Sequence, residues 1–134
     1  MRLTISRGLI DEMRARASSS PNAEICGLLL GQESRISEVR HCANIAVDSS
    51  DSFEIDPAAL IAAHRSARKG GPVLLGHYHS HPRGAARPSR RDAEAAEAGT
   101  YWIILGEGDL NCWHTTRDQA GVIRFDPVEL VSAD

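Results

Sequence analysis

The sequence lacks several patterns that would assign it to a familiar class of protein. Its three cysteines, Cys26, Cys42 and Cys112, are odd in number and form no C-x-x-C pair, so neither a zinc ribbon nor a redox dithiol is indicated. The missing C-x-x-C also argues against the zinc nucleobase deaminases, which need two cysteine ligands. No apolar run approaches the length of a membrane span, and the N-terminus has no apolar segment of the signal-peptide type. We therefore expect a soluble, cytoplasmic protein without a membrane partner, in which Cys26 and Cys112 are small buried residues.

Charge gives no general case for nucleic-acid binding, because the formal net charge is −3. The charge is unevenly spread, however, since no acidic residue occurs from Pro57 to Arg91. Four arginines fall near the end of this segment: Arg83, Arg87, Arg90 and Arg91. They are typical of solvated loop charge, and they also fit a rim that receives an acidic protein or a carboxylate.

Length and an apolar content of 42% predict one domain over residues 1–134. Periodicity and capping residues predict helices over 9–17 and 57–69, and a short third helix that follows Ser89 and is closed by Gly99. Apolar runs predict strands near 25–30, 35–45, 72–81, 101–105 and 110–114, with an edge strand at 122–131. The expected fold class is α/β, a mixed β-sheet flanked by helices.

The most informative motif is His79-Ser80-His81-Pro82, which is followed by Ser89 and Asp92. The apolar segment 72–76 before it predicts a buried strand. If that strand continues through His81, the side chains of His79 and His81 project from the same face. Zinc accepts imidazole nitrogens at about 2.0–2.1 Å and a carboxylate oxygen at a similar distance. The two histidines therefore form a candidate metal site, with Asp92 as the natural third ligand.

Other interpretations of the same residues stay open at this point. Ser89 and Asp92 also fit a capping box at the start of a helix. His77 alternates with His79 and His81, so any two of the three could form the pair. Glu24 opens the apolar run 25–30, where a carboxylate is expected to be exposed unless it has a partner, because burying an ionised group is costly.

Taken together, Glu24 and the spacing His79-x-His81-x7-Ser89-x2-Asp92 resemble the signature of the JAMM (JAB/MPN) zinc metallopeptidase family. The resemblance implies the MPN/JAB fold, with layering like that of the cytidine deaminases. It also implies one zinc ion per chain, bound by His79, His81 and Asp92, with water at the fourth position. By the same resemblance, Glu24 is the general base and Ser89 donates a hydrogen bond to the oxyanion. His77 is then a strand residue on the same face and not a ligand.

The resemblance is to the minimal, stand-alone prokaryotic type of this family. It implies a hydrolase that cleaves an amide bond at the C-terminus of a small ubiquitin-like or sulfur-carrier protein. Two alternatives within the fold are a general zinc peptidase or amidase that acts on unrelated tails, and a non-catalytic interaction module. Outside the family, the chain could be a metal-binding or structural protein with a chance pattern.

Overall fold

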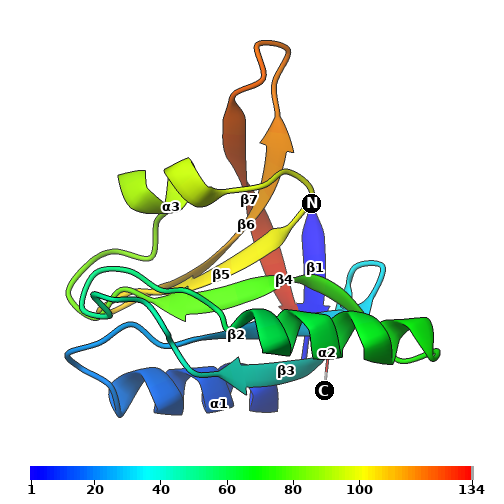
Figure 1. The fold of residues 1–134 in the computed structure, drawn as a ribbon, viewed down its shortest axis with the longest axis horizontal. Coiled ribbons are helices and arrows are strands. Elements are labelled where there is room, and N and C mark those ends of the chain that lie inside the picture. The colour runs from blue at the N-terminus through cyan, green and yellow to red at the C-terminus, as the bar shows by residue number, and fades with distance from the viewer. Residues whose placement is uncertain (134) are drawn as a thin grey trace.

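The computed structural model describes residues 1–133, which form a mixed β-sheet closed into a barrel and three helices around it (Figure 1). The strands are β1 (Arg2–Ile5), β2 (Cys26–Gln32), β3 (Arg35–Cys42), β4 (Val73–Ser80), β5 (Tyr101–Leu105), β6 (Leu110–Arg117) and β7 (Ile123–Ser132). Their order around the barrel is β1-β3-β2-β4-β5-β6-β7. The barrel closes because β1 also pairs in parallel with β7, where Arg2 lies opposite Glu129 and Ile5 opposite Ser132. The predicted α/β class with a mixed sheet is confirmed.

The helices are α1 (Arg7–Ser18), α2 (Pro57–Arg68) and α3 (Arg90–Ala95). Ser6 caps α1, where its hydroxyl accepts a hydrogen bond from the Leu9 amide at 3.2 Å. Asp56 caps α2 by accepting from the Ala58 amide at 3.0 Å, with Pro57 in the first helical turn as the sequence predicts. No helix in the described part of the chain combines the length and the apolar character that crossing a bilayer requires.

Strand β2 divides the interior into two cores, because its side chains alternate between the faces of the sheet. Leu29 packs with Leu3, Ile5 and Met13 on the face that carries α1. Leu28 and Leu30 pack with Ala63 of α2 on the opposite face. This second face is the one that carries the histidines of β4.

Tyr78, which lies between His77 and His79 in β4, faces the α1 side and is fully buried. Its hydroxyl accepts a hydrogen bond from Arg16 of α1 at 2.5 Å. Arg16 also donates to the carbonyl oxygens of Cys26 at 2.8 Å and Cys42 at 2.9 Å. One guanidinium therefore joins α1 to three neighbouring strands directly behind the histidines.

Strands β4 and β5 run in parallel and approach closely at Gly76, which lies opposite Tyr101. A Cβ at Gly76 would stand 1.8 Å from the Tyr101 carbonyl oxygen, so no larger residue fits there. The strand ends at Ser80, one residue before the predicted end, but the His81 amide still donates to the Leu105 carbonyl at 2.7 Å. This bond extends the pairing to His81 and fixes its backbone beside the sheet.

Three predictions about the elements need correction. The segment 122–131 does form a strand, but β7 is not at an edge, because β1, which the sequence analysis did not predict, pairs with it. Strand β3 ends at Cys42 and not near 45. Helix α3 ends well before Gly99 because residues beyond it bond to β6: the Thr115 hydroxyl donates to the Glu97 carbonyl at 2.6 Å, and the Gly99 amide donates to the Thr115 carbonyl at 2.8 Å.

Candidate metal centre

The two motif histidines meet at the C-terminal end of β4, where their rings project from the α2 side of the sheet. His79 is fully buried, and His81 is partly exposed just after the strand. Their Nε2 atoms lie 3.1 Å apart. Asp92 of α3 completes the group, since its Oδ2 lies 3.2 Å from Nε2 of His79 and 3.1 Å from Nε2 of His81.

These three donor atoms form a nearly equilateral triangle. Donor atoms around a tetrahedral zinc ion at about 2.0–2.1 Å are separated by about 3.3 Å, so the observed edges of 3.1–3.2 Å suit such an ion. The ring of His81 is also oriented for ligation. Its Nδ1 lies 3.0 Å from the Ala85 carbonyl oxygen, a contact in which a protonated Nδ1 donates and leaves Nε2 with its lone pair toward the triangle.

The electrostatics of the triangle also favour a bound cation. Burial disfavours the Asp92 carboxylate, but the hydrogen bonds from His79 and His81 outweigh it and hold the pKa of Asp92 well below its usual range. Burial lowers the pKa of His79. Burial also disfavours the charged form of His81, but its contacts with Asp92 and the Ala85 carbonyl outweigh this effect and raise the pKa of His81. Asp92 and His79 therefore have the protonation state that a metal ion requires of its ligands, and His81 would release a proton on metal binding.

Ser89 and Asp92 form a complete capping box at the start of α3. The Asp92 amide donates to Ser89 Oγ at 3.0 Å, and the Ser89 amide donates to Asp92 Oδ2 at 2.9 Å. The capping interpretation of this pair is therefore correct, and it does not exclude a catalytic role. The cap uses a lone pair of the Ser89 hydroxyl, whose proton remains available to another acceptor.

Glu24 approaches the histidines from the loop before β2. A carboxylate oxygen of Glu24 and one ring nitrogen each of His79 and His81 lie within 4.8 Å of one another. Glu24 is only 5% exposed, which contradicts the exposed alternative. Its Oε1 is buried and has no hydrogen-bond partner among residues 1–133. Burial raises the pKa of Glu24 to about 7, although His81 opposes this shift.

Asn44, which the sequence analysis missed, holds the backbone of Glu24. Its side-chain amide donates to the carbonyl oxygens of Glu24 at 2.9 Å and Ser52 at 3.0 Å. Its Oδ1 accepts from the amides of Ala46 at 3.0 Å and Glu54 at 3.1 Å. The only signal in the sequence is an asparagine soon after a strand, which is common in turns, so its role becomes visible only in the fold.

An aromatic wall flanks the metal centre and contains His77. The ring of Phe53 stacks on His79 at a centroid distance of 4.3 Å, and His77 lies 5.0 Å from Phe53 and 4.4 Å from Trp102. Nε2 of His77 is buried without a hydrogen-bond partner in the described part of the chain, and burial lowers the pKa of His77 to about 3. The structure thus places His77 as a neutral packing residue outside the triangle.

Two cavities adjoin the triangle, and their linings have no residue in common. One, of about 370 Å³, is mainly apolar and is lined by Asp92 together with His77, Phe53 and Trp102. The other, of about 390 Å³, is lined by Glu24, His81 and Ser89, and by Arg83 and Arg87 of the predicted arginine rim. The sequence-predicted site residues are therefore brought together, with Glu24 and Ser89 on the same side of the triangle.

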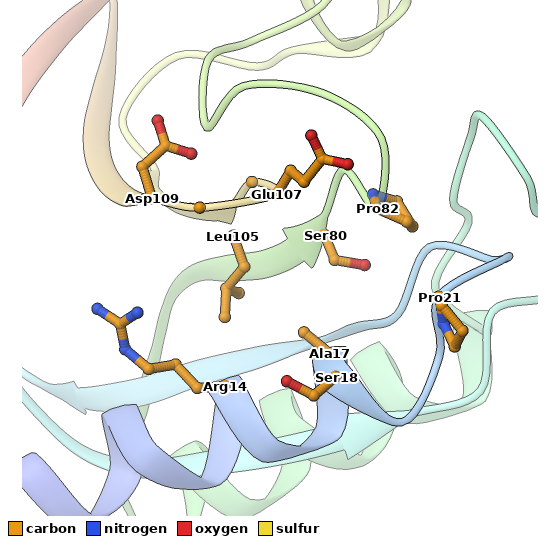
Figure 2. A pocket seen from close by; sticks show the side chains of 11 residues that line it. Arg14, Ala17, Ser18, Pro21, Ser80, Pro82, Leu105, Glu107 and Asp109 are labelled. Atoms are coloured by element: carbon orange, nitrogen blue, oxygen red, sulfur yellow. The ribbon is translucent and has the colours of Figure 1, made fainter.

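A third cavity, of about 350 Å³, contains none of the predicted site residues. Figure 2 shows it between α1, which contributes Arg14, Ala17 and Ser18, and the turn that carries Glu107 and Asp109. Ser80 at its edge lies next to His79 in sequence, but its hydroxyl accepts a hydrogen bond from the Ile25 amide at 2.9 Å. It is thereby engaged in joining β4 to the start of β2.

Comparisons with known proteins show the family of this chain. A family model described as prokaryotic homologues of the JAB domain matches residues 6–116. The chain is 34% identical over 104 residues to a probable TtuB-protein conjugate cleaving protease of Thermus thermophilus, which covers 78% of this chain and 70% of that protein. It is 33% identical over 97 residues to a desampylase of Pyrococcus furiosus, which covers 71% of this chain and 69% of that protein. The solution structure of protein DSY2949 from Desulfitobacterium hafniense superimposes with a TM-score of 0.78 at 27% identity, covering 98% of this chain and 94% of that one.

Proposed function

Because the chain belongs to the family of prokaryotic homologues of the JAB domain, we propose that it is a zinc-dependent hydrolase of amide bonds. Its substrate is the C-terminal tail of a small ubiquitin-like or sulfur-carrier protein. The relative described as cleaving TtuB-protein conjugates supports this substrate class. The observation that carries the proposal is the triangle of donor atoms with 3.1–3.2 Å edges, beside a buried Glu24 oxygen that has no hydrogen-bond partner among residues 1–133.

His79, His81 and Asp92 would hold one zinc ion per chain, and Glu24 would remain outside the ligand set because Asp92, and not Glu24, contacts both histidines directly. A zinc ion held there would supply Lewis-acid chemistry, which activates water near neutral pH. Glu24 accepts the proton of the attacking water and passes it to the leaving nitrogen as the C–N bond breaks. Burial raises the pKa of Glu24, which makes its carboxylate a stronger base for the first transfer.

Ser89 donates its hydroxyl proton to the carbonyl oxygen as negative charge develops there. Such a donor typically contributes a factor of about 10²–10³ in rate, because the hydrogen bond strengthens in the transition state. The Phe53 ring covers His79 and keeps the ligand ring fixed and dry. The products are a free carboxylate on the ubiquitin-like protein and a free amine.

The test is the Glu24→Gln variant, with Glu94→Gln as the matched control on the exposed face of α3. Cleavage of a ubiquitin-like protein fused through its C-terminus is followed at saturating zinc, together with metal content and melting temperature. Glu24→Gln is expected to keep one zinc and the fold but to lose cleavage, since the amide cannot accept the proton. An active Glu24→Gln enzyme would remove Glu24 from the mechanism, and absence of cleavage by the wild type with zinc bound would contradict the proposed activity.

A further inference from the structure

The cavity on the Glu24 side of the metal centre contains the reacting groups and two arginines together. Glu24, His81 and Ser89 form one part of its lining, and Arg83 and Arg87, from the loop between β4 and α3, form another. A group bound there would therefore lie within a residue or so of the bond that is cleaved.

The positive charge of this cavity is not neutralised by the neighbouring acids. Asp51 also lines the cavity, but it pairs with Arg91 at 3.2 Å. Arg83 donates to the neutral amide oxygen of Asn22 at 3.2 Å, which orients its guanidinium and leaves its charge uncompensated. Within residues 1–133, Arg87 makes no ion pair with a carboxylate. Two guanidinium groups thus face a cavity whose remaining acid, Glu24, serves the reaction.

The backbone that carries Arg87 is held rigidly. The Ala86 amide donates to the Asp109 carboxylate at 3.1 Å. The Ala86 carbonyl accepts from the Asn111 side chain at 3.3 Å and from the Trp113 indole at 3.2 Å. Pro88 follows Arg87 and restricts its backbone further. The backbone of Arg87 is therefore held in place, while its exposed side chain is ordered only when it binds an anion.

The position of Glu24 decides which side of the scissile bond occupies this cavity. The leaving nitrogen must receive its proton from Glu24, so the residue on the amine side lies where Glu24 does. The mainly apolar cavity lined by Phe53 and Trp102 then accommodates the acyl side.

We propose that Arg87, assisted by Arg83, binds the free α-carboxylate of the leaving residue, so that the enzyme prefers to release a single C-terminal amino acid. This inference rests on the proposed function and adds the class of leaving group. A guanidinium and a carboxylate form paired, charge-assisted hydrogen bonds, which a neutral carboxamide or a bulky protein chain cannot reproduce at the same place. The bond broken is the same amide, and the arginines position the leaving residue without taking part in proton transfer.

The experiment compares three substrates made from one ubiquitin-like protein: extended by alanine with a free carboxylate, extended by alaninamide, and joined to a lysine side chain of a second protein. Each is given to the zinc-saturated wild type and to Arg87→Gln, Arg83→Gln and Arg87→Lys. Arg90→Gln is the control, because Arg90 is exposed on α3 and does not line the cavity. Melting temperature and zinc content are measured for every variant.

The wild type is expected to cleave the free acid with a kcat/KM about 10- to 100-fold above that of the alaninamide, the range for hydrogen bonds to a charged partner. Arg87→Gln should remove most of this preference by slowing the free acid alone, Arg87→Lys should restore part of it, and Arg90→Gln should retain it. Equal cleavage of acid and amide by the wild type overturns the inference and leaves the proposed function intact. A preference that survives in Arg87→Gln and Arg83→Gln, or faster cleavage of the lysine-linked protein, also overturns it. Failure to cleave any of the three substrates contradicts the proposed function itself.

Discussion

Replacing Asn44 by alanine separates the positioning of Glu24 from the binding of the metal. Asn44 makes four hydrogen bonds with its side chain, two of them to the carbonyl oxygens of Glu24 and Ser52. A hydrogen bond contributes about 0.5–1.5 kcal/mol net. Since Asn44 is half-buried and water replaces part of each bond, we expect a loss of about 2–4 kcal/mol in the free energy of unfolding. For a chain of this length that corresponds to a fall in Tm of roughly 7–14 °C.

The effect on catalysis should exceed what stability explains. The ligands come from β4 and α3, which Asn44 does not touch, so Asn44→Ala should still bind one zinc per chain. Glu24 loses the bond that fixes its carbonyl, and a displacement of about 1 Å in a catalytic group can cost about 100-fold in rate. We expect kcat to fall by about 10- to 100-fold at a temperature well below Tm, while KM changes by less than about threefold.

Two further variants make the result decisive. Asn44→Asp keeps the acceptor for the amides of Ala46 and Glu54 but places a carboxylate oxygen against the carbonyl oxygens of Glu24 and Ser52, so it should be at least as slow as Asn44→Ala. Thr116→Ala is the control, because the Thr116 hydroxyl donates one hydrogen bond, to Asp126 of β7, and none to the Glu24 segment. A folded, zinc-loaded Asn44→Ala enzyme with wild-type kcat would refute the reasoning and reduce Asn44 to a loop residue.

Three other outcomes follow from the same structure. Metal analysis should find that His77→Ala retains its zinc, whereas each of three ligand variants loses it: His79→Ala, His81→Ala and Asp92→Asn. The reverse pattern would show that His77 belongs to the ligand pair. Ser89→Ala should lower the free energy of unfolding by about 0.5–2 kcal/mol, because the helix loses its cap, and should lower kcat by a factor of about 10²–10³. Ser89→Asp should fold about as well as the wild type and be nearly inactive. Equal activity in the wild type and Ser89→Asp would show that Ser89 is a helix cap only. Burial raises the pKa of Cys26 from 9.0 to about 11 and that of Cys112 from 9.0 to about 12. Because unfolding then releases protons above pH 9, the free energy of unfolding measured in urea should fall as the pH rises from 9 toward 11. A flat profile over that range would contradict the burial argument.

The site was predictable from the sequence where its geometry is local. Alternation along β4 places His79 and His81 on one face, and the capping box fixes Ser89 and Asp92 relative to each other within one helical turn. Glu24 could be connected to these residues only through the family resemblance. It lies just before β2, which pairs with β4 although the two strands are far apart in the sequence. Asn44 was missed for the same reason: its partners Glu24 and Ser52 are distant in sequence, and no local pattern distinguishes it from an ordinary turn residue.

The fold shows the same division between local and long-range information. The start of α2 is predictable from Asp56 and Pro57, because both act within the first turn of the helix. The pairing of β1 with β7 depends on segments at opposite ends of the described chain, and the alternating Leu3 and Ile5 give only a four-residue signal. The early end of α3 depends on Thr115 of β6, which captures the Glu97 carbonyl. Neither contact has a counterpart in the neighbouring sequence.

The closure of the barrel by β1 and β7 has a consequence for biosynthesis. Among the described elements, the ribosome synthesises β1 first and its parallel partner β7 last. Leu3 and Ile5, which are fully buried in the folded protein, therefore lack the neighbouring strand β7 until it has emerged. Helix α1 and the hairpin of β2 and β3 can associate early because their contacts are close in sequence, whereas joining Arg2 to Glu129 requires closure of a loop that contains nearly the whole domain. The nascent chain therefore acquires its closed form only after β7 has been synthesised, and until then Thr4 is the single residue that pairs β1 with β3.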